Sequence, residues 1–152
     1  IYLRLHERNF QWDHEKIWKR ELPNIKLTRS NEVTLSKVYM ETDLIIYSYI
    51  ATGFLESLAL DKPNILISKL DEWPLKKNVI NDFKKLSEAG IFFETNEDAL
   101  LHLNKYKDNL DVWWNDPNVV KIKKEFVLKF ANLIPESKKI SFLKKIIKEK
   151  LN

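Results

Sequence analysis

The sequence predicts an α/β protein with a Rossmann-like open parallel sheet of about five strands, helices on both faces and further helices at the C-terminus. Short apolar runs, rich in β-branched and aromatic residues, alternate along the chain with segments of helical period, as they do in βαβ units. Parallel strands need crossover connections, and right-handed crossovers place helices against the sheet. The alternation therefore indicates a parallel rather than an antiparallel sheet.

Each predicted strand is a short apolar run between polar or turn-forming residues. The run DLIIYS, residues 43–48, is the strongest, because it is apolar at successive positions, as in strands buried on both faces. The first run, IYLRLH, carries one charge at Arg4. The predicted strands span residues 2–6, 25–28, 43–48, 64–68 and 91–94.

The segments between the strands carry helix start and stop signals. Asp13 is expected to cap the first helix, and Pro23 ends it. Gly90 is expected to stop the helix before the last strand, and Asn96 to cap the next one. The predicted helices span residues 13–22, 33–42, 53–60, 75–89 and 96–106, and everything from Pro117 onward is helical with a break at Pro135.

Length and composition predict one domain, or one half of a larger two-domain protein. The 152 residues are 44% hydrophobic, which is enough for a core, and the absence of cysteine excludes disulfides and fits a cytoplasmic protein. Because the sequence opens with Ile1 rather than Met, directly in a strand-like run, we interpret it as a piece of a longer chain. The expected boundaries are residues 1–132 for the Rossmann-like domain and 133–152 for a basic C-terminal helix.

The segment SKKISFLKKIIKEKLN, residues 137–152, is rich in lysine around an apolar stripe. It predicts an amphipathic helix over residues 137–150, with Ile140, Leu143 and Ile147 on the face that packs. A basic helix can also contact acidic lipid, which makes the inner face of the membrane an alternative location.

The segment from Thr52 to Glu56 is the strongest candidate site. It follows the 43–48 run, and a helix N-terminus there would present N–H groups and partial positive charge to a phosphate. Gly53 allows close approach to the backbone, and Thr52 can cap the helix or offer a hydroxyl. Glu56, one turn beyond Thr52, is placed to accept hydrogen bonds from ribose. The structural alternative is a plain strand–helix junction, with Glu56 stabilising the helix dipole.

Other motifs narrow the function. No G-x-G-x-x-G and no P-loop is present, so the dehydrogenase and ATPase interpretations lose their main support. Three scattered histidines form no metal-ligand pattern, and no bound metal or cofactor is expected. Trp73, just past a strand, could stack on a base or pack under its loop. Trp113 and Trp114 are expected in the core.

The motif TGFLESLALDKPNILI resembles the nucleotide-sugar-binding motif of GT-B glycosyltransferases. The wider pattern, which includes YLRLHERNFQW, DFKKLSEAGIFFET and the WW pair, is similar to transferases from bacterial surface-carbohydrate loci over residues 2–131. The resemblance implies the C-terminal, donor-binding half of a GT-B enzyme, with the acceptor-binding domain on its N-terminal side.

By position, the resemblance implies that Thr52 and Gly53 meet the diphosphate and that Glu56 meets the ribose or the sugar. Ser48 is a further substrate-binding candidate beside them, and Arg4 would lie at the end of the first strand, facing the interdomain cleft. The implied partners are a nucleotide sugar and a carbohydrate or lipid-linked acceptor, without nucleic acid. GT-B enzymes are similar in needing no bound metal.

Two further hypotheses remain open from the sequence. The chain could be a non-catalytic α/β binding module that docks through its basic terminal helix. It could also be an epimerase-like enzyme acting on a sugar nucleotide, because such enzymes share the same half-fold. Dependence of binding on residues 48–56 favours the enzymes, and steep salt dependence through the terminal lysines favours the module.

Overall fold

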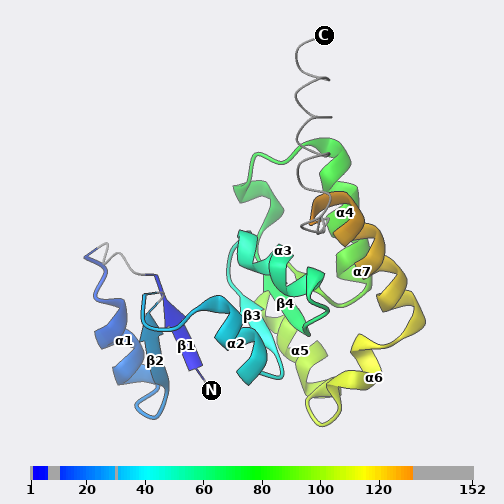
Figure 1. The fold of residues 1–152 in the computed structure, drawn as a ribbon. Helices are drawn as coiled ribbons and strands as arrows, with labels where there is room; N and C mark the ends of the chain where they lie inside the picture. The colour runs from blue at the N-terminus through cyan, green and yellow to red at the C-terminus, as the bar shows by residue number, and fades with distance from the viewer. Residues whose placement is uncertain (1, 7–10, 30, 132–152) are drawn as a thin grey trace, which may run out of the picture. The chain divides into compact units, whose positions relative to one another are not determined.

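The computed structural model describes residues 2–6, 11–29 and 31–131, in which strands and helices alternate (Figure 1). The chain divides into two compact units, Ile1–Asp43 and Leu44–Asn152, and each is described by itself. Every strand pairing is parallel, in one sheet of two strands and one of three. The predicted α/β class, with parallel strands and C-terminal helices, is confirmed. The predicted basic helix over residues 137–150 lies outside the described residues.

The first unit consists of two βα pairs. β1 and β2 pair in parallel, with Arg4 opposite Thr28. The elements are β1 (Tyr2–Leu5), α1 (His14–Glu21), β2 (Lys26–Arg29) and α2 (Leu35–Glu41).

Side chains at the surface link α1 to β2 in the first unit. Glu15 of α1 accepts hydrogen bonds from Lys19 at 2.8 Å and from Arg29 of β2 at 2.7 Å, and these bonds lower the pKa of Glu15 to about 2. The predicted cap at Asp13 is wrong in its chemistry. Asp13 occupies the N-cap position, but its backbone is left-handed (φ 48°) and its carboxylate pairs with Lys16, so it makes no side-chain capping bond.

The second unit has a three-stranded parallel sheet in the order β3-β4-β5. Its strands are β3 (Ile45–Tyr47), β4 (Asn64–Ile67) and β5 (Phe92–Phe93). Its helices are α3 (Thr52–Ala59), the short 3-10 helix η1 (Leu70–Glu72), α4 (Lys77–Glu88), α5 (Asn96–Tyr106), α6 (Leu110–Trp114) and α7 (Pro117–Phe130).

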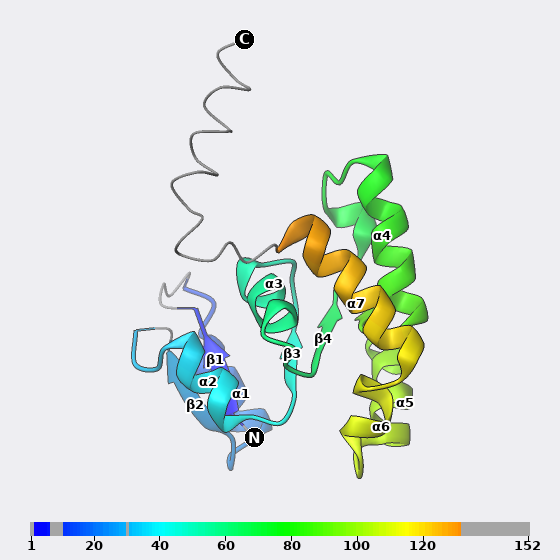
Figure 2. The ribbon, with the colours of Figure 1, turned by 45° about the vertical axis from the view of Figure 1, so that its right-hand side comes forward.

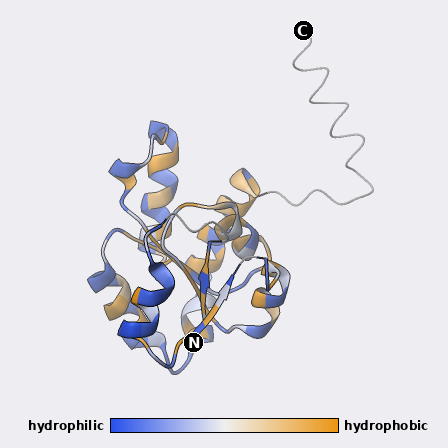
Figure 3. Ribbon diagram, turned by 90° about the vertical axis from the view of Figure 1, so that its left-hand side faces the viewer, coloured by the Kyte–Doolittle hydropathy of each residue, from blue (hydrophilic) through white to orange (hydrophobic). Residues whose placement is uncertain are grey.

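The core of this unit lies where α3, α4 and α7 meet the sheet. Phe126 of α7 makes edge-to-face contacts with Phe54 of α3 and with Phe83 of α4, and Phe83 makes another with Phe92 of β5. Figure 2 shows α7 running beside α4. Polar and apolar stretches alternate along the helices (Figure 3), as expected when one face packs and the other meets water. In the described ranges no helix is long and apolar enough to cross a membrane.

Gly90 ends α4 as the sequence predicts. Its φ of +69° is left-handed, its N–H donates to Ser87 O, and the N–H of Ile91 donates to Leu86 O. This is a Schellman motif, with the buried Leu86 and Ile91 as its apolar pair. A Cβ on Gly90 would lie 2.3 Å from Cε1 of His102, so the ring of His102 fills the space that a side chain would need.

A buried lysine joins three elements on the side of the sheet where β4 begins. Lys123 of α7, 5% exposed, donates 2.8 Å hydrogen bonds to Asp61 Oδ1 and to Trp114 O. Its ammonium also lies 3.7 Å from the centre of the Trp114 ring, and Trp114 Nε1 donates to Asp61. Trp113 and Trp114 are both buried, as expected. These contacts therefore stabilise the packing of α7 and α6 at this edge of the sheet.

Candidate functional site

The residues of the candidate site lie at the opposite edge of the three-stranded sheet, where its strands end. Because β3, β4 and β5 are parallel, the segments that follow them emerge at one edge, where open α/β sheets bind ligands. Ser48, Thr52, Gly53 and Glu56 lie at the β3–α3 junction, and Trp73 follows β4. The structure thus places five of the six predicted site residues at this edge.

Tyr47 fixes the β3–α3 junction. As the last residue of β3 it donates a 2.8 Å hydrogen bond from its hydroxyl to Gly53 O, and its ring packs edge-to-face on Phe54. Gly53 is buried, whereas Thr52 and Glu56 are exposed. Since residues four apart share one face of a helix, Thr52 and Glu56 together form an exposed polar strip that starts at the first turn of α3.

The predicted capping role of Thr52 is wrong. Ala51 is the N-cap residue, with an extended backbone, and no side chain in the described part of the chain caps α3. Thr52 is the first helical residue, so its hydroxyl is not at the position from which a cap reaches the N–H groups of the first turn. The hydroxyl remains in the exposed strip, where a ligand can meet it.

The helices that begin at this edge differ in charge. In α5, the hydroxyl of Thr95 accepts from Asp98 N at 3.2 Å, and Glu97 and Asp98 lie in the first turn. The predicted cap at Asn96 is therefore corrected to Thr95, one residue earlier. Neither α3 nor α4 has an acidic residue in its first turn or a side-chain cap. A phosphate is therefore favoured at α3 or α4 and disfavoured at α5.

Trp73 is held within the loop after β4. Its indole Nε1 donates a 3.0 Å hydrogen bond to Ser68 Oγ, and the side chain is partly buried. This bond closes the segment from Ser68 to Trp73 on itself, as the loop-packing alternative expects. Stacking of Trp73 on a nucleotide base stays a prediction.

Arg4 lies in the first unit, on β1. It is partly buried, and its Nη2 donates a 3.2 Å hydrogen bond to Val33 O, just before α2. One contribution of its guanidinium is therefore to hold the β2–α2 connection. Its predicted contact with substrate stays a prediction.

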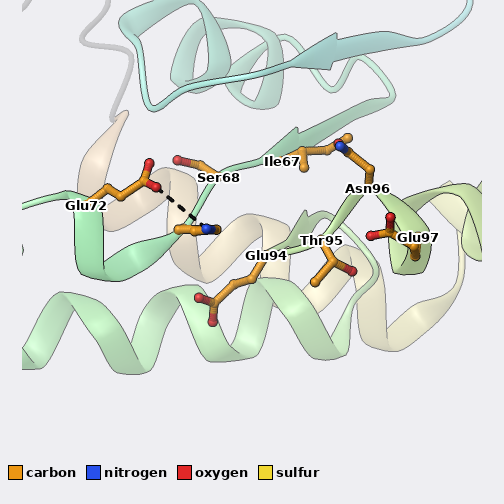
Figure 4. Close-up of a pocket in the computed structure, with 8 residues that line it drawn as sticks. Ile67, Ser68, Glu72, Glu94, Thr95, Asn96 and Glu97 are labelled. Atoms are coloured by element: carbon orange, nitrogen blue, oxygen red, sulfur yellow. Dashed lines mark ion pairs between the residues drawn. The ribbon is translucent and has the colours of Figure 1, made fainter.

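A cavity of about 320 Å³ opens beside the ends of β4 and β5 (Figure 4). Three of its lining side chains, Glu72, Glu94 and Glu97, are carboxylates, and one, Lys69, is cationic. Lys69 pairs with Glu72 at 3.9 Å, and Leu70 N donates to Glu94 Oε2 at 3.4 Å. The full lining is Ile67, Ser68, Lys69, Glu72, Glu94, Thr95, Asn96 and Glu97.

Most residues of this cavity were not predicted from the sequence. The signal was present in the letters ETNE, residues 94–97, which follow the last strand directly and so fall at its carboxyl end.

Among the residues that the structure describes, no group of three or more histidine and acidic side chains is arranged to hold a metal ion.

An open parallel sheet with helix N-termini and a polar cavity at the carboxyl ends of its strands defines an α/β protein suited to bind a small polar molecule. The chain belongs to a family of transferases: the model described as LIC12162 family transferase matches residues 1–146. No match was found among curated proteins or among solved structures. Membership of a transferase family agrees with the coarser part of the resemblance seen in the sequence.

Proposed function

We propose that this protein is the donor-binding part of a glycosyltransferase, which transfers a sugar from a nucleotide sugar during synthesis of a surface polysaccharide. The observation that carries the proposal is the β3–α3 junction. It combines an uncapped helix N-terminus, free of acidic residues in its first turn, with an exposed threonine and a glutamate one turn apart. Family membership supports transferase chemistry, and the resemblance to GT-B motifs supports the donor class.

The junction suits a nucleoside diphosphate for electrostatic reasons. The N-terminus of a helix carries about half a positive charge and directs N–H groups at an anion. The hydroxyl of Thr52 adds a donor at the first turn, and Glu56 lies about 6 Å further along the helix axis, roughly one turn away. A carboxylate there accepts hydrogen bonds from the two hydroxyls of a ribose.

The same features assist departure of the nucleotide. When the bond between sugar and diphosphate breaks, negative charge grows on the leaving oxygen, and fixed positive charge at that point lowers the barrier. The α3 N-terminus supplies part of this charge. Lys69 after β4, and Lys76 and Lys77 at the start of α4, are further cationic side chains at this edge.

Calorimetric titration with UDP, CDP and GDP sugars tests the proposal. Thr52→Ala is expected to weaken binding of the best ligand by about 1–2 kcal/mol, which is roughly 5- to 30-fold. Glu56→Gln keeps the shape, removes the charged acceptor and is expected to weaken binding by a similar factor. Because Thr52 is not the cap, neither change should lower the stability of the fold by more than about 0.5 kcal/mol.

Glu88→Gln is the matched control, because Glu88 is an exposed glutamate at the C-terminal end of α4. It should bind as the parent does. If Thr52→Ala and Glu56→Gln also bind as the parent does, the site is wrong. If no nucleotide sugar binds at all, the proposed function is wrong.

A further inference from the structure

The acidic cavity, defined by Glu72, Glu94 and Glu97 with Lys69, lies beside the junction that we assign to the diphosphate. β4 is the central strand of the sheet, with β3 on one side and β5 on the other. Neighbouring strands lie about 4.8 Å apart, so the ends of β3 and β5 are separated by roughly 10 Å. A ligand held by its diphosphate after β3 therefore has the cavity within a short reach along the same edge.

The lining of the cavity fits hydroxyl groups rather than phosphate. Its three carboxylates against one ammonium give a formal charge of −2, and α5 begins there with Glu97 and Asp98 in its first turn. A second anion is repelled from such a place. Sugar hydroxyls are donors that carboxylates accept, and Asn96 and Ser68 add groups that both donate and accept.

The carboxylates of the cavity have capacity for a ligand. Glu94 accepts a long hydrogen bond from Leu70 N at 3.4 Å, and Glu72 forms a loose ion pair with Lys69 at 3.9 Å. An ionised carboxylate has about four acceptor positions, so each of these side chains can accept several more hydrogen bonds.

We propose that the acidic cavity receives the sugar of the nucleotide sugar, and that its charge selects neutral or amino sugars against sugars that carry a carboxylate. The inference rests on the proposed function and adds the substrate class to it. The negative lining attracts a protonated amino sugar, accepts hydrogen bonds from a neutral sugar and repels the carboxylate of a uronic acid.

The test compares two sugars on one nucleotide with the whole chain. UDP-glucose and UDP-glucuronate, or GDP-mannose and GDP-mannuronate if GDP sugars bind better, are titrated by calorimetry at low salt. The parent is expected to bind the neutral sugar at least about fivefold more tightly than the uronate. Because the effect is electrostatic, the ratio should shrink in 0.5 M salt.

Substitutions locate the source of the selection. The triple variant Glu72→Gln, Glu94→Gln, Glu97→Gln keeps side-chain shape and removes all three charges. It is expected to reduce the difference in affinity between the neutral sugar and the uronate to about twofold or less. Glu88→Gln, outside the cavity, should keep the parent ratio. The three single variants, each expected to lower the ratio in part, replace the triple variant if it fails to fold.

The outcomes separate the two proposals. Equal affinity of the parent for the neutral sugar and the uronate overturns the inference and leaves the proposed function standing. A ratio that persists unchanged in the glutamine variants also overturns it, because the cavity is then not its source. Binding of no nucleotide sugar overturns both.

Discussion

Replacing Lys123 tests the interaction that joins α7 to the α3–β4 turn. Lys123→Met keeps an unbranched chain of similar length and removes the ammonium. The change deletes the hydrogen bonds to Asp61 and Trp114 O and the contact with the Trp114 ring. The change is local, because one partner, Asp61, lies in the α3–β4 turn and the other, Trp114, is the last residue of α6.

The expected loss of stability follows from three contributions. The carbonyl of Trp114 loses a buried donor, which costs about 1–3 kcal/mol. The ring contact adds about 0.5–2 kcal/mol. The bond to Asp61 adds less than about 1 kcal/mol, because the Asp61 side chain is 73% exposed and stays hydrated. Part of this loss is offset because the variant no longer buries a charged ammonium. Burial of that ammonium is unfavourable, and it lowers the pKa of Lys123. We expect a net loss of about 2 kcal/mol.

Urea unfolding, followed by far-UV circular dichroism, measures the change. Lys85→Met is the matched control: Lys85 also pairs with α7, through Glu125 at 3.2 Å, but both side chains are about half exposed. That pair should contribute less than about 0.5 kcal/mol. If the two variants lose equal stability, the argument from burial is wrong.

Two further predictions concern Gly90, in the turn after α4, and the ring of His102 beside it. Gly90→Ala should destabilise the protein by at least about 2 kcal/mol in the same urea assay, because alanine is strained at φ +69° and its Cβ would clash with His102; Ser87→Ala, one turn earlier, should change little. Burial, with a smaller contribution from Lys105, lowers the pKa of His102 below 6.5, so the unfolded state binds more protons. Stability should therefore be full above pH 6.5 and fall as the pH drops below it, by at most about 1.4 kcal/mol per pH unit. His102→Gln should reduce this loss, and an unchanged pH profile in that variant would contradict the assignment.

Local patterns carried enough information to predict the described strands and the described helices other than η1 and α6. NILI of β4, with three buried residues and one partly buried, and the glycine that ends α4 both depend on contacts close in sequence, and both lie within a residue or two of their predicted positions. The cap of α3 shows the limit of such prediction. Ala51 rather than Thr52 is the N-cap residue, and the hydrogen bond from Tyr47 to Gly53 O that fixes this turn is not visible in a local pattern.

The candidate site was predictable where it lies along one stretch of chain and not where it is assembled from several. Ser48, Thr52, Gly53 and Glu56 belong to one strand–turn–helix segment, so their spacing placed them together. The cavity needs residues 67–72 and 94–97 side by side, and that depends on the pairing of β4 with β5.

The sequence by itself determined the order of the strands and of the described helices other than η1 and α6, the parallel pairing and the turn at Gly90, because periodicity and backbone preference act within a few residues. Only the tertiary structure decided that Lys123 is buried, since its partner Asp61 lies 62 positions away and nothing near Lys123 signals it. The tertiary structure likewise decided that three exposed glutamates share one cavity. The physical reason is the same in both cases: burial and charge depend on what the folded chain brings near a residue, and that neighbourhood exists only after the strands have paired.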